Sequence, residues 1–236
     1  MKQTILILFL VALCAYSQVQ AQNNADAFMK QAQEHLAKKE NIEARNLFLQ
    51  AYNAFSSENN YDKAVECGVR ASTLYHQENS YKEAFDLLRG VDMIVTTGER
   101  KTKKSMPELR FRISKERLQM YIGLKNPTRA KDQLVRLEEI AKASRNDSLN
   151  KDLLYTQANY YYTFGQNAQG DDAINRLIGK YKEQKNYAKV DECYKTLIGI
   201  ARKANNAALT ARTYDKYILW TDSVKALTAR DALNVL

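Results

Sequence analysis

The sequence contains few residues that break or restrict helices. Its 236 residues include only two prolines and eight glycines. Strand-favouring runs are nearly absent, and the one β-favouring stretch is 93–97. Short polar residues must therefore separate the elements, and asparagine stands wherever an apolar stripe restarts, as at Asn59, Asn79, Asn126, Asn146, Asn186 and Asn205. The composition predicts an all-α chain.

Residues that enzymes and metal sites require are also scarce. The two histidines, His35 and His76, lie in different segments of the chain. There is no glycine-rich phosphate loop, no Gly-x-Ser-x-Gly turn and no cluster of cysteine ligands. Carboxylates and lysines are spread as on solvated helix faces, with pairs such as Glu34 and Lys38 four residues apart. We therefore expect no enzymatic activity, no cofactor and no metal.

One apolar run stands out, at the N-terminus. Residues 5–15 are apolar, follow Met1 and Lys2, and precede a small-x-small sequence that ends at Ala21. Eleven apolar residues are too few to cross a bilayer core of about 30 Å. Residues 1–21 are thus predicted to be a cleaved signal peptide of an exported, periplasmic protein. Acylation at Cys14 is the alternative, although Leu13 before it is large for that processing.

The chain has a basic excess, with a formal charge of +9. Removing the signal peptide removes only Lys2, so most of this excess stays in the mature chain. An exported protein rarely meets nucleic acid, so the charge favours solubility or anionic partners, including a membrane surface. Its densest run is 100–104, within the polar stretch 96–104. We interpret that stretch as an extended, solvated loop between helix pairs.

Small residues recur along the chain at a loose period. Ala44, Ala84, Ala130, Ala173 and Thr210 are each followed four and seven positions later by residues suited to helix packing, at steps of 40, 46, 43 and 37 residues. Two helices of about 17 residues and two short turns have that length. The period predicts a right-handed α-α superhelix, a solenoid of about five helical hairpins.

Apolar stripes and caps place ten helices, at 24–40, 42–57, 60–77, 80–96, 106–124, 127–143, 147–165, 168–184, 187–204 and 206 to about 234. The repeat domain is expected to span 22–223. Residues 224–236 extend the last helix beyond its hairpin, and the stripe stops at Leu236 without a capping residue. We expect this extension to be the start of a coiled coil towards a membrane segment.

Two cysteines, Cys67 and Cys193, remain in the predicted mature chain. A disulfide needs α-carbons within about 7 Å, whereas helices of a solenoid touch only their neighbours. These two cysteines lie about three hairpins apart in sequence. We therefore predict two buried, unreactive thiols without a bridge.

Two stretches, Tyr61-Asp62-Lys63-Ala64 and Tyr81-Lys82-Glu83-Ala84, resemble the aromatic-x-x-alanine signature of tetratricopeptide repeats. Tyr75, Tyr121 and Phe164 match the aromatic residue that this family has nine positions before the alanine. The chain departs from the family at Ser72, Leu118 and Tyr161, in lacking the closing proline, and in its longer period. The resemblance covers most of 24–223 and implies a helical-hairpin array that binds proteins or peptides.

A narrower resemblance lies at 214–223, whose pattern Tyr-x-x-Tyr-x-x-x-x-Asp-Ser is similar to the end of exported repeat arrays in some bacterial membrane-bound regulators. It implies the periplasmic sensing region of a signalling protein. A free-standing periplasmic adaptor for an envelope complex and a small-molecule or glycan receptor are the alternatives.

The inner wall of such an array is lined by the first helix of each pair. Matching register along the chain places the following side chains in this groove: Val69, Thr73, His76, Lys115, Gln119, Tyr155 and Tyr162. Tyrosines suit a binding wall because they bury a large area with few rotatable bonds. The expected partner is a protein or peptide, with no nucleic acid, and with a membrane only through a missing C-terminal segment.

Overall fold

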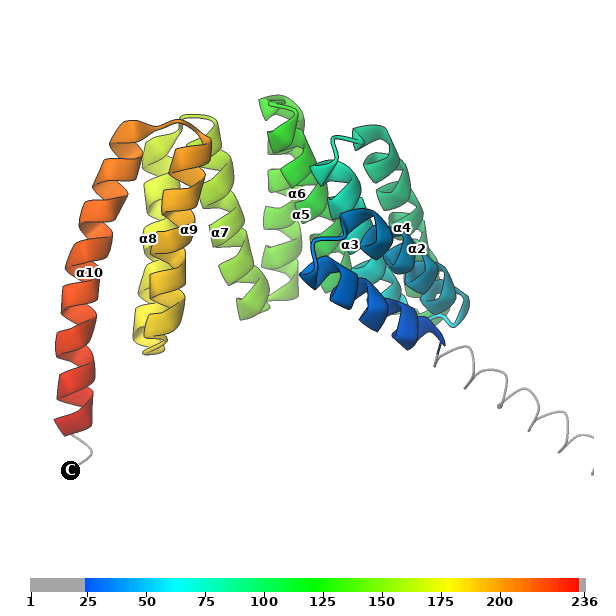
Figure 1. Cartoon of the computed structure of the whole chain (residues 1–236), viewed down its shortest axis with the longest axis horizontal. Coiled ribbons are helices and arrows are strands. Elements are labelled where there is room, and N and C mark those ends of the chain that lie inside the picture. Colours follow the sequence, from blue (N-terminus) through cyan, green and yellow to red (C-terminus); the bar gives the residue numbers. More distant parts are fainter. Residues whose placement is uncertain (1–23, 234–236) are drawn as a thin grey trace, which may run out of the picture. The chain divides into compact units, whose positions relative to one another are not determined.

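The computed structural model describes residues 24–233, and every regular element in that range is an α-helix (Figure 1). Residues 24–37 are helical. The helices that follow are α2 (Asn41–Ser57), α3 (Tyr61–Gln77), α4 (Tyr81–Thr102), α5 (Pro107–Gly123), α6 (Pro127–Ser144), α7 (Asp147–Thr163), α8 (Asn167–Glu183), α9 (Tyr187–Lys203) and α10 (Ala207–Leu233). The all-α helical-repeat fold is as predicted, and ten helical segments agree with five pairs. The predicted signal peptide at 1–21 lies outside the described residues.

The chain divides after Leu124 into two compact units. The described part of unit 1 contains the helical segment 24–37 and α2–α5, and unit 2 contains α6–α10. In unit 1, α3 packs against α2, α4 and α5. In unit 2, α7 packs against α6, α8 and α9, and α9 packs against α10. Each unit is therefore a stack of antiparallel neighbours with its own core.

The helices start at a regular spacing that is broken once. Helices α2, α3 and α4 begin at 41, 61 and 81, and α5–α10 begin at 107, 127, 147, 167, 187 and 207. The step is thus 20 residues everywhere except between α4 and α5, where it is 26. Six of these helices have 17 residues. The true repeat is one 17-residue helix with a three-residue turn.

The turn itself fixes this spacing. Each turn contains one residue in the left-handed region, and these residues are Lys39, Asn59, Asn79, Lys103, Lys125, Arg145, Gly165, Lys185 and Asn205. After most helices, a backbone N–H then reaches back five residues, as from Asn60 to the Phe55 carbonyl at 2.9 Å. This hydrogen-bonded helix end satisfies carbonyls that the helix leaves open. Because the same end recurs, the turn length is nearly constant.

The core of unit 1 lies where helix positions repeat. The fourth, eighth and eleventh residues are fully buried in α2 (Ala44, Phe48, Ala51) and in α4 (Ala84, Leu88, Val91). Helix α3 fits between them with small residues. A Cβ on Gly68 would overlap the Val91 side chain, and the buried Ser72 hydroxyl donates to the Ala84 carbonyl at 3.2 Å. Small residues thus set the close approach of α3 to α4.

Unit 2 corrects the register expected for the fourth repeat. The fourth residue of α8 is Gly170, which lies 40 residues after Ala130 and 40 before Thr210. The expected residue, Ala173, is also buried but stands three positions later. Gly170 is required because a Cβ there would lie 2.7 Å from the Tyr162 ring. Gly170 and Ala173 are both small and lie on the same face of α8, so the sequence spacing alone assigned the repeat position to the wrong residue.

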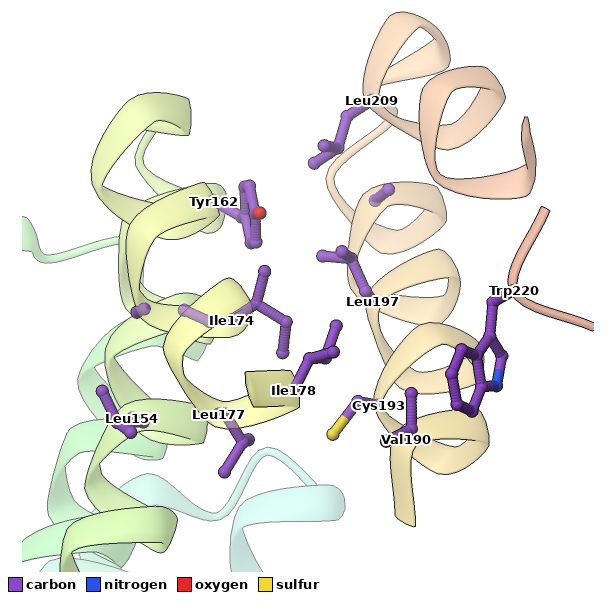
Figure 2. Packing of buried hydrophobic residues seen from close by; sticks show 13 residues of the cluster. Leu154, Tyr162, Ile174, Leu177, Ile178, Val190, Cys193, Leu197, Leu209 and Trp220 are labelled. Carbon is purple, nitrogen blue, oxygen red and sulfur yellow. The ribbon is translucent and has the colours of Figure 1, made fainter. Parts of the chain in front are cut away.

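Between α7, α8, α9 and α10, apolar side chains meet in one cluster (Figure 2). Ile178 from α8 and Cys193 from α9 face each other, and Trp220 flanks α9 beside Val190 (Figure 2). In α10 the expected contact residue Tyr214 is 36% exposed, whereas Thr213 is 1% exposed. The expected residues Thr210, Tyr214 and Tyr217 do stand at the fourth, eighth and eleventh positions of α10. Tyr214 accepts a hydrogen bond from Arg202 of α9 at 2.7 Å, but Thr213 and Trp220 are the residues that α10 buries here.

The expectation of an extended loop at 96–104 is wrong. Helix α4 continues to Thr102, and the strand-favouring stretch 93–97 is part of this helix. Val95 and Gly98 are buried on α4, and the Arg110 guanidinium binds Asp92 and Glu99 of this helix. Packing and ion pairing therefore hold a segment whose composition alone suggests a loop.

Cys67 and Cys193 are free and buried, as predicted, and they lie in different units. Burial raises the pKa of the Cys67 thiol to about 12 and the pKa of the Cys193 thiol to about 11. The reactive thiolate is therefore a minor species at neutral pH.

Candidate functional site

In unit 1, α3 and α5 lie side by side and bring together five of the seven expected groove residues. From α3 come Val69, Thr73 and His76, and from α5 come Lys115 and Gln119. Each of these residues is partly exposed. We refer to these five residues as the α3/α5 face.

The base of this face is fixed by packing. Val69 packs against the cluster around Val91 and also against the cluster around Leu88. One turn further along α3, the Thr73 hydroxyl donates to the Val69 carbonyl at 3.0 Å. These contacts hold Val69 and Thr73 in place on α3.

His76 is held on both sides. Its Nδ1 lies 3.3 Å from the Glu116 carboxylate on α5, and both side chains are largely buried, at 20% and 10% exposure. Its ring packs against Tyr81 with centroids 5.4 Å apart. A Cβ on Gly123 would lie 3.0 Å from its Nε2. Contacts with Glu116, Tyr81 and the Gly123 region thus hold the His76 ring in place between α3 and α5.

Glu116 was not anticipated from the sequence. Its pairing with His76 depends on the position of α5 along α3. That position depends in turn on the segment between α4 and α5, where the step between helix starts is 26 residues and not 20. His76 and Glu116 are 40 residues apart, but because of the longer step Glu116 stands six positions earlier in α5 than His76 stands in α3. No spacing within α5 signals the contact.

The two remaining expected residues, Tyr155 and Tyr162, lie in unit 2 and differ in how exposed their side chains are. Tyr155 on α7 is partly exposed and packs against the cluster of Figure 2. Burial raises the pKa of its hydroxyl, which also bonds to Thr196. Tyr155 therefore remains a candidate contact residue, anchored to α9.

Tyr162 does not line a groove. Its side chain is 1% exposed, and its hydroxyl donates to Asp171 on α8 at 2.8 Å. Arg212 on α10 binds the same carboxylate at 2.8 Å. Burial and this carboxylate raise the pKa of the Tyr162 hydroxyl. Tyr162 is thus an internal link between helices, and its expected role at the groove was wrong.

Neither a membrane span nor a metal cluster is found in the part of the chain that the structure describes. Across 24–233, no helix combines the length and apolar character needed to cross a bilayer. Nor do three or more His, Cys, Asp or Glu side chains in this range come together in a way that could hold a metal ion.

No protein-family model matches the sequence, and no curated protein matches it. Among solved structures, the crystal structure of the apo form of RapI superposes with a TM-score of 0.50 at 14% identity, over 86% of this chain and 85% of RapI. The chain has a tetratricopeptide-like helical-repeat fold.

Two further structures align more loosely. Pseudomonas aeruginosa PilF gives a TM-score of 0.38 at 14% identity, over 88% of this chain and 99% of PilF. The designed helical repeat protein DHR64 gives 0.27 at 16% identity, over 91% and 97%.

Proposed function

We propose that this chain is a non-catalytic binding module that holds an extended peptide or a helix of a protein partner on the α3/α5 face. The observation that carries the proposal is the set of five partly exposed side chains that two adjacent helices present together. The tetratricopeptide-like fold supports it, because stacked helices offer a long, preformed surface.

The chemistry of the α3/α5 face suits a peptide. Val69 offers apolar area, whereas Gln119 and Lys115 offer an amide and an ammonium group that can bond to backbone carbonyls or carboxylates. The His76 ring is fixed by Glu116 and Tyr81. A rigid wall that mixes apolar and polar groups loses little entropy on binding.

The test is selection of ligands from a phage-displayed library of random dodecapeptides on the mature chain, 22–236. Peptides that bind should lose about tenfold in affinity when Lys115 and Gln119 are both replaced by alanine, the loss expected for two contact residues near a binding centre. The matched control is Lys142→Ala, which removes an exposed lysine of α6. Peptides that bind the double variant as well as the parent, or a library without binders, would refute this site.

We further propose that the protein is exported and acts as the periplasmic sensing region of a membrane-bound regulator. The charged start, apolar run and small-residue cleavage sequence at 1–21 support export, and the long α10 supports a connection to a further segment. Expression in a bacterium should release a chain that begins at Gln22, as measured by mass. Recovery of the native protein with membranes would support the sensing role, whereas a free periplasmic protein would support an adaptor.

A further inference from the structure

A second surface lies in unit 1, at the one place where the 20-residue spacing is broken. The step from α4 to α5 has six extra residues, which extend α4 to Thr102 and carry most of the basic run Arg100, Lys101, Lys103 and Lys104. Helices α2, α3 and α5–α9 pack with 17 or 18 residues and no such addition. The extra residues are therefore not needed to build the repeat.

The added segment has a fixed structure. The Glu99 carboxylate binds the Arg110 guanidinium at 2.7 Å and accepts the Met106 backbone N–H at 2.9 Å. On the other side of the helix, a Cβ on Gly98 would lie 3.0 Å from the Tyr61 ring. Arg100 and Lys101 are thus carried by an anchored turn of helix, and Lys103 and Lys104 follow directly after its end.

This turn forms one wall of a pocket of about 280 Å³ between the α2–α3 turn and α4. Met93 and Ile94 supply apolar lining, and Asn59, Tyr61, Thr97 and Lys101 supply polar lining. A 17-residue α4 would end at Thr97, so the pocket has its cationic wall only because of the extra residues. We refer to this pocket and the basic run as the α4 groove.

The charge of the α4 groove is not neutralised within the described part of the chain. The Lys101 ammonium donates to the Asn59 side-chain oxygen at 2.8 Å, which also accepts the Tyr61 hydroxyl at 3.0 Å. An ammonium group has three N–H donors, so two remain for a ligand. The acidic residue of the segment, Glu99, is already bound to Arg110.

We propose that the α4 groove binds an acidic peptide segment, with a carboxylate on Lys101 and an adjacent apolar side chain on Met93 and Ile94. Met93 is 69% exposed and lines the same pocket as Lys101, so the groove offers apolar area beside its charge. The net basic charge of the chain attracts an acidic partner over a longer range. The groove shares no residue with the α3/α5 face, so each site is tested separately.

A peptide fits this surface better than a lipid bilayer does. The exposed apolar atoms lie in a concave pocket beside the charges. A bilayer surface is broad and would contact the basic run without filling that pocket. An extended chain, in contrast, can place one side chain inside and its neighbour on the rim.

The experiment uses fluorescence anisotropy with the mature chain and a labelled dodecapeptide of alternating glutamate and leucine. A peptide in which glutamine replaces glutamate is the charge control, and vesicles containing phosphatidylglycerol provide the alternative anionic surface. The acidic peptide should bind, and Lys101→Gln should weaken binding about two- to fivefold, as for one partly exposed ion pair. Met93→Gln should weaken it about fivefold through the lost apolar contact. Lys142→Gln should leave it unchanged.

Two results would overturn the proposal. One is equal affinity for the acidic and neutral peptides, or equal affinity of the parent and Lys101→Gln for the acidic one. The other is vesicle binding that Lys101→Gln abolishes while no acidic peptide binds, which would assign the segment to a membrane surface. Circular dichroism of the variants ensures that a loss of binding is not a loss of fold.

Discussion

At the scale of single residues, the turns carry a conformational cost. Each of the nine turns needs one left-handed residue, yet only Gly165 is a glycine. Lysine, arginine and asparagine occupy the others. A residue with a Cβ is disfavoured in this region by roughly 1–2 kcal/mol. The array therefore tolerates local strain in exchange for a constant helix spacing.

Gly165 and Gly179 allow this cost to be measured in one unit. A Cβ at either position would meet no atom within 4 Å, but Gly165 has a φ of +75° whereas Gly179 lies inside α8. We expect Gly165→Ala to lower the free energy of unfolding by about 1 kcal/mol. Gly179→Ala should raise it by about 0.5–1 kcal/mol, because alanine favours a helix. Urea unfolding followed by circular dichroism measures both.

The pair of variants serves as its own control, since both add one methyl group to an uncrowded site. Equal shifts in the two urea midpoints would contradict the conformational explanation.

The sequence predicted that asparagines separate the helices, and Asn60, Asn126 and Asn186 do accept a backbone N–H at helix starts. It did not predict that lysines in the turns adopt the left-handed backbone conformation, because lysine has no marked preference for turns.

At the scale of elements, α4 shows the limit of local patterns. Nine of the ten expected helices lie close to their observed positions, because 17-residue stripes separated by polar turns are readable from composition. The end of α4 is not readable, since it depends on pairing between Glu99 and Arg110, eleven residues apart. Contacts between elements decide such a boundary, and they leave no periodic signal in the sequence.

The Glu99 contact predicts a pH dependence of stability. The Arg110 hydrogen bond lowers the pKa of the Glu99 carboxyl from its ordinary value of 4.5. A lowered folded-state pKa means that the charged form stabilises the fold above about pH 4.5 and that this contribution is lost as the pH falls through the lowered value. Glu99→Gln should therefore lose stability at pH 7, and its stability should fall less steeply than that of the parent between about pH 5 and 3.

Glu83→Gln is the matched control, since Glu83 is an exposed carboxylate near the start of the same helix. Thermal unfolding at several pH values measures all three proteins. A Glu99→Gln curve parallel to that of the parent would show that the Arg110 contact is not formed in solution.

At the scale of the whole molecule, the fold class was predictable, and the placement of the seven expected residues was predictable in part. Five of them lie on the adjacent helices α3 and α5, and α3 was expected within one residue of its observed bounds; their role in binding stays a prediction. Tyr162 was misplaced because Tyr160, Tyr161 and Tyr162 are consecutive and one residue rotates a helix by about 100°. Tyr160 and Tyr162 are both buried. Tyr162 packs against Gly170 and bonds to Asp171 of the next helix, so its burial depends on α8 and not on α7 alone.

The division into two units gives a prediction about cooperativity, because each unit contains one buried cysteine. Burial raises the pKa of both thiols, so a thiol reagent reacts mainly when the unit that contains the cysteine opens. Gly165→Ala weakens unit 2 and should speed labelling of Cys193 about fivefold, the equivalent of about 1 kcal/mol. Cys67 should react at the parent rate, as mass spectrometry of peptides from the mature chain would measure. Equal acceleration at both cysteines would mean that the two units open together, and the array would then be one cooperative body.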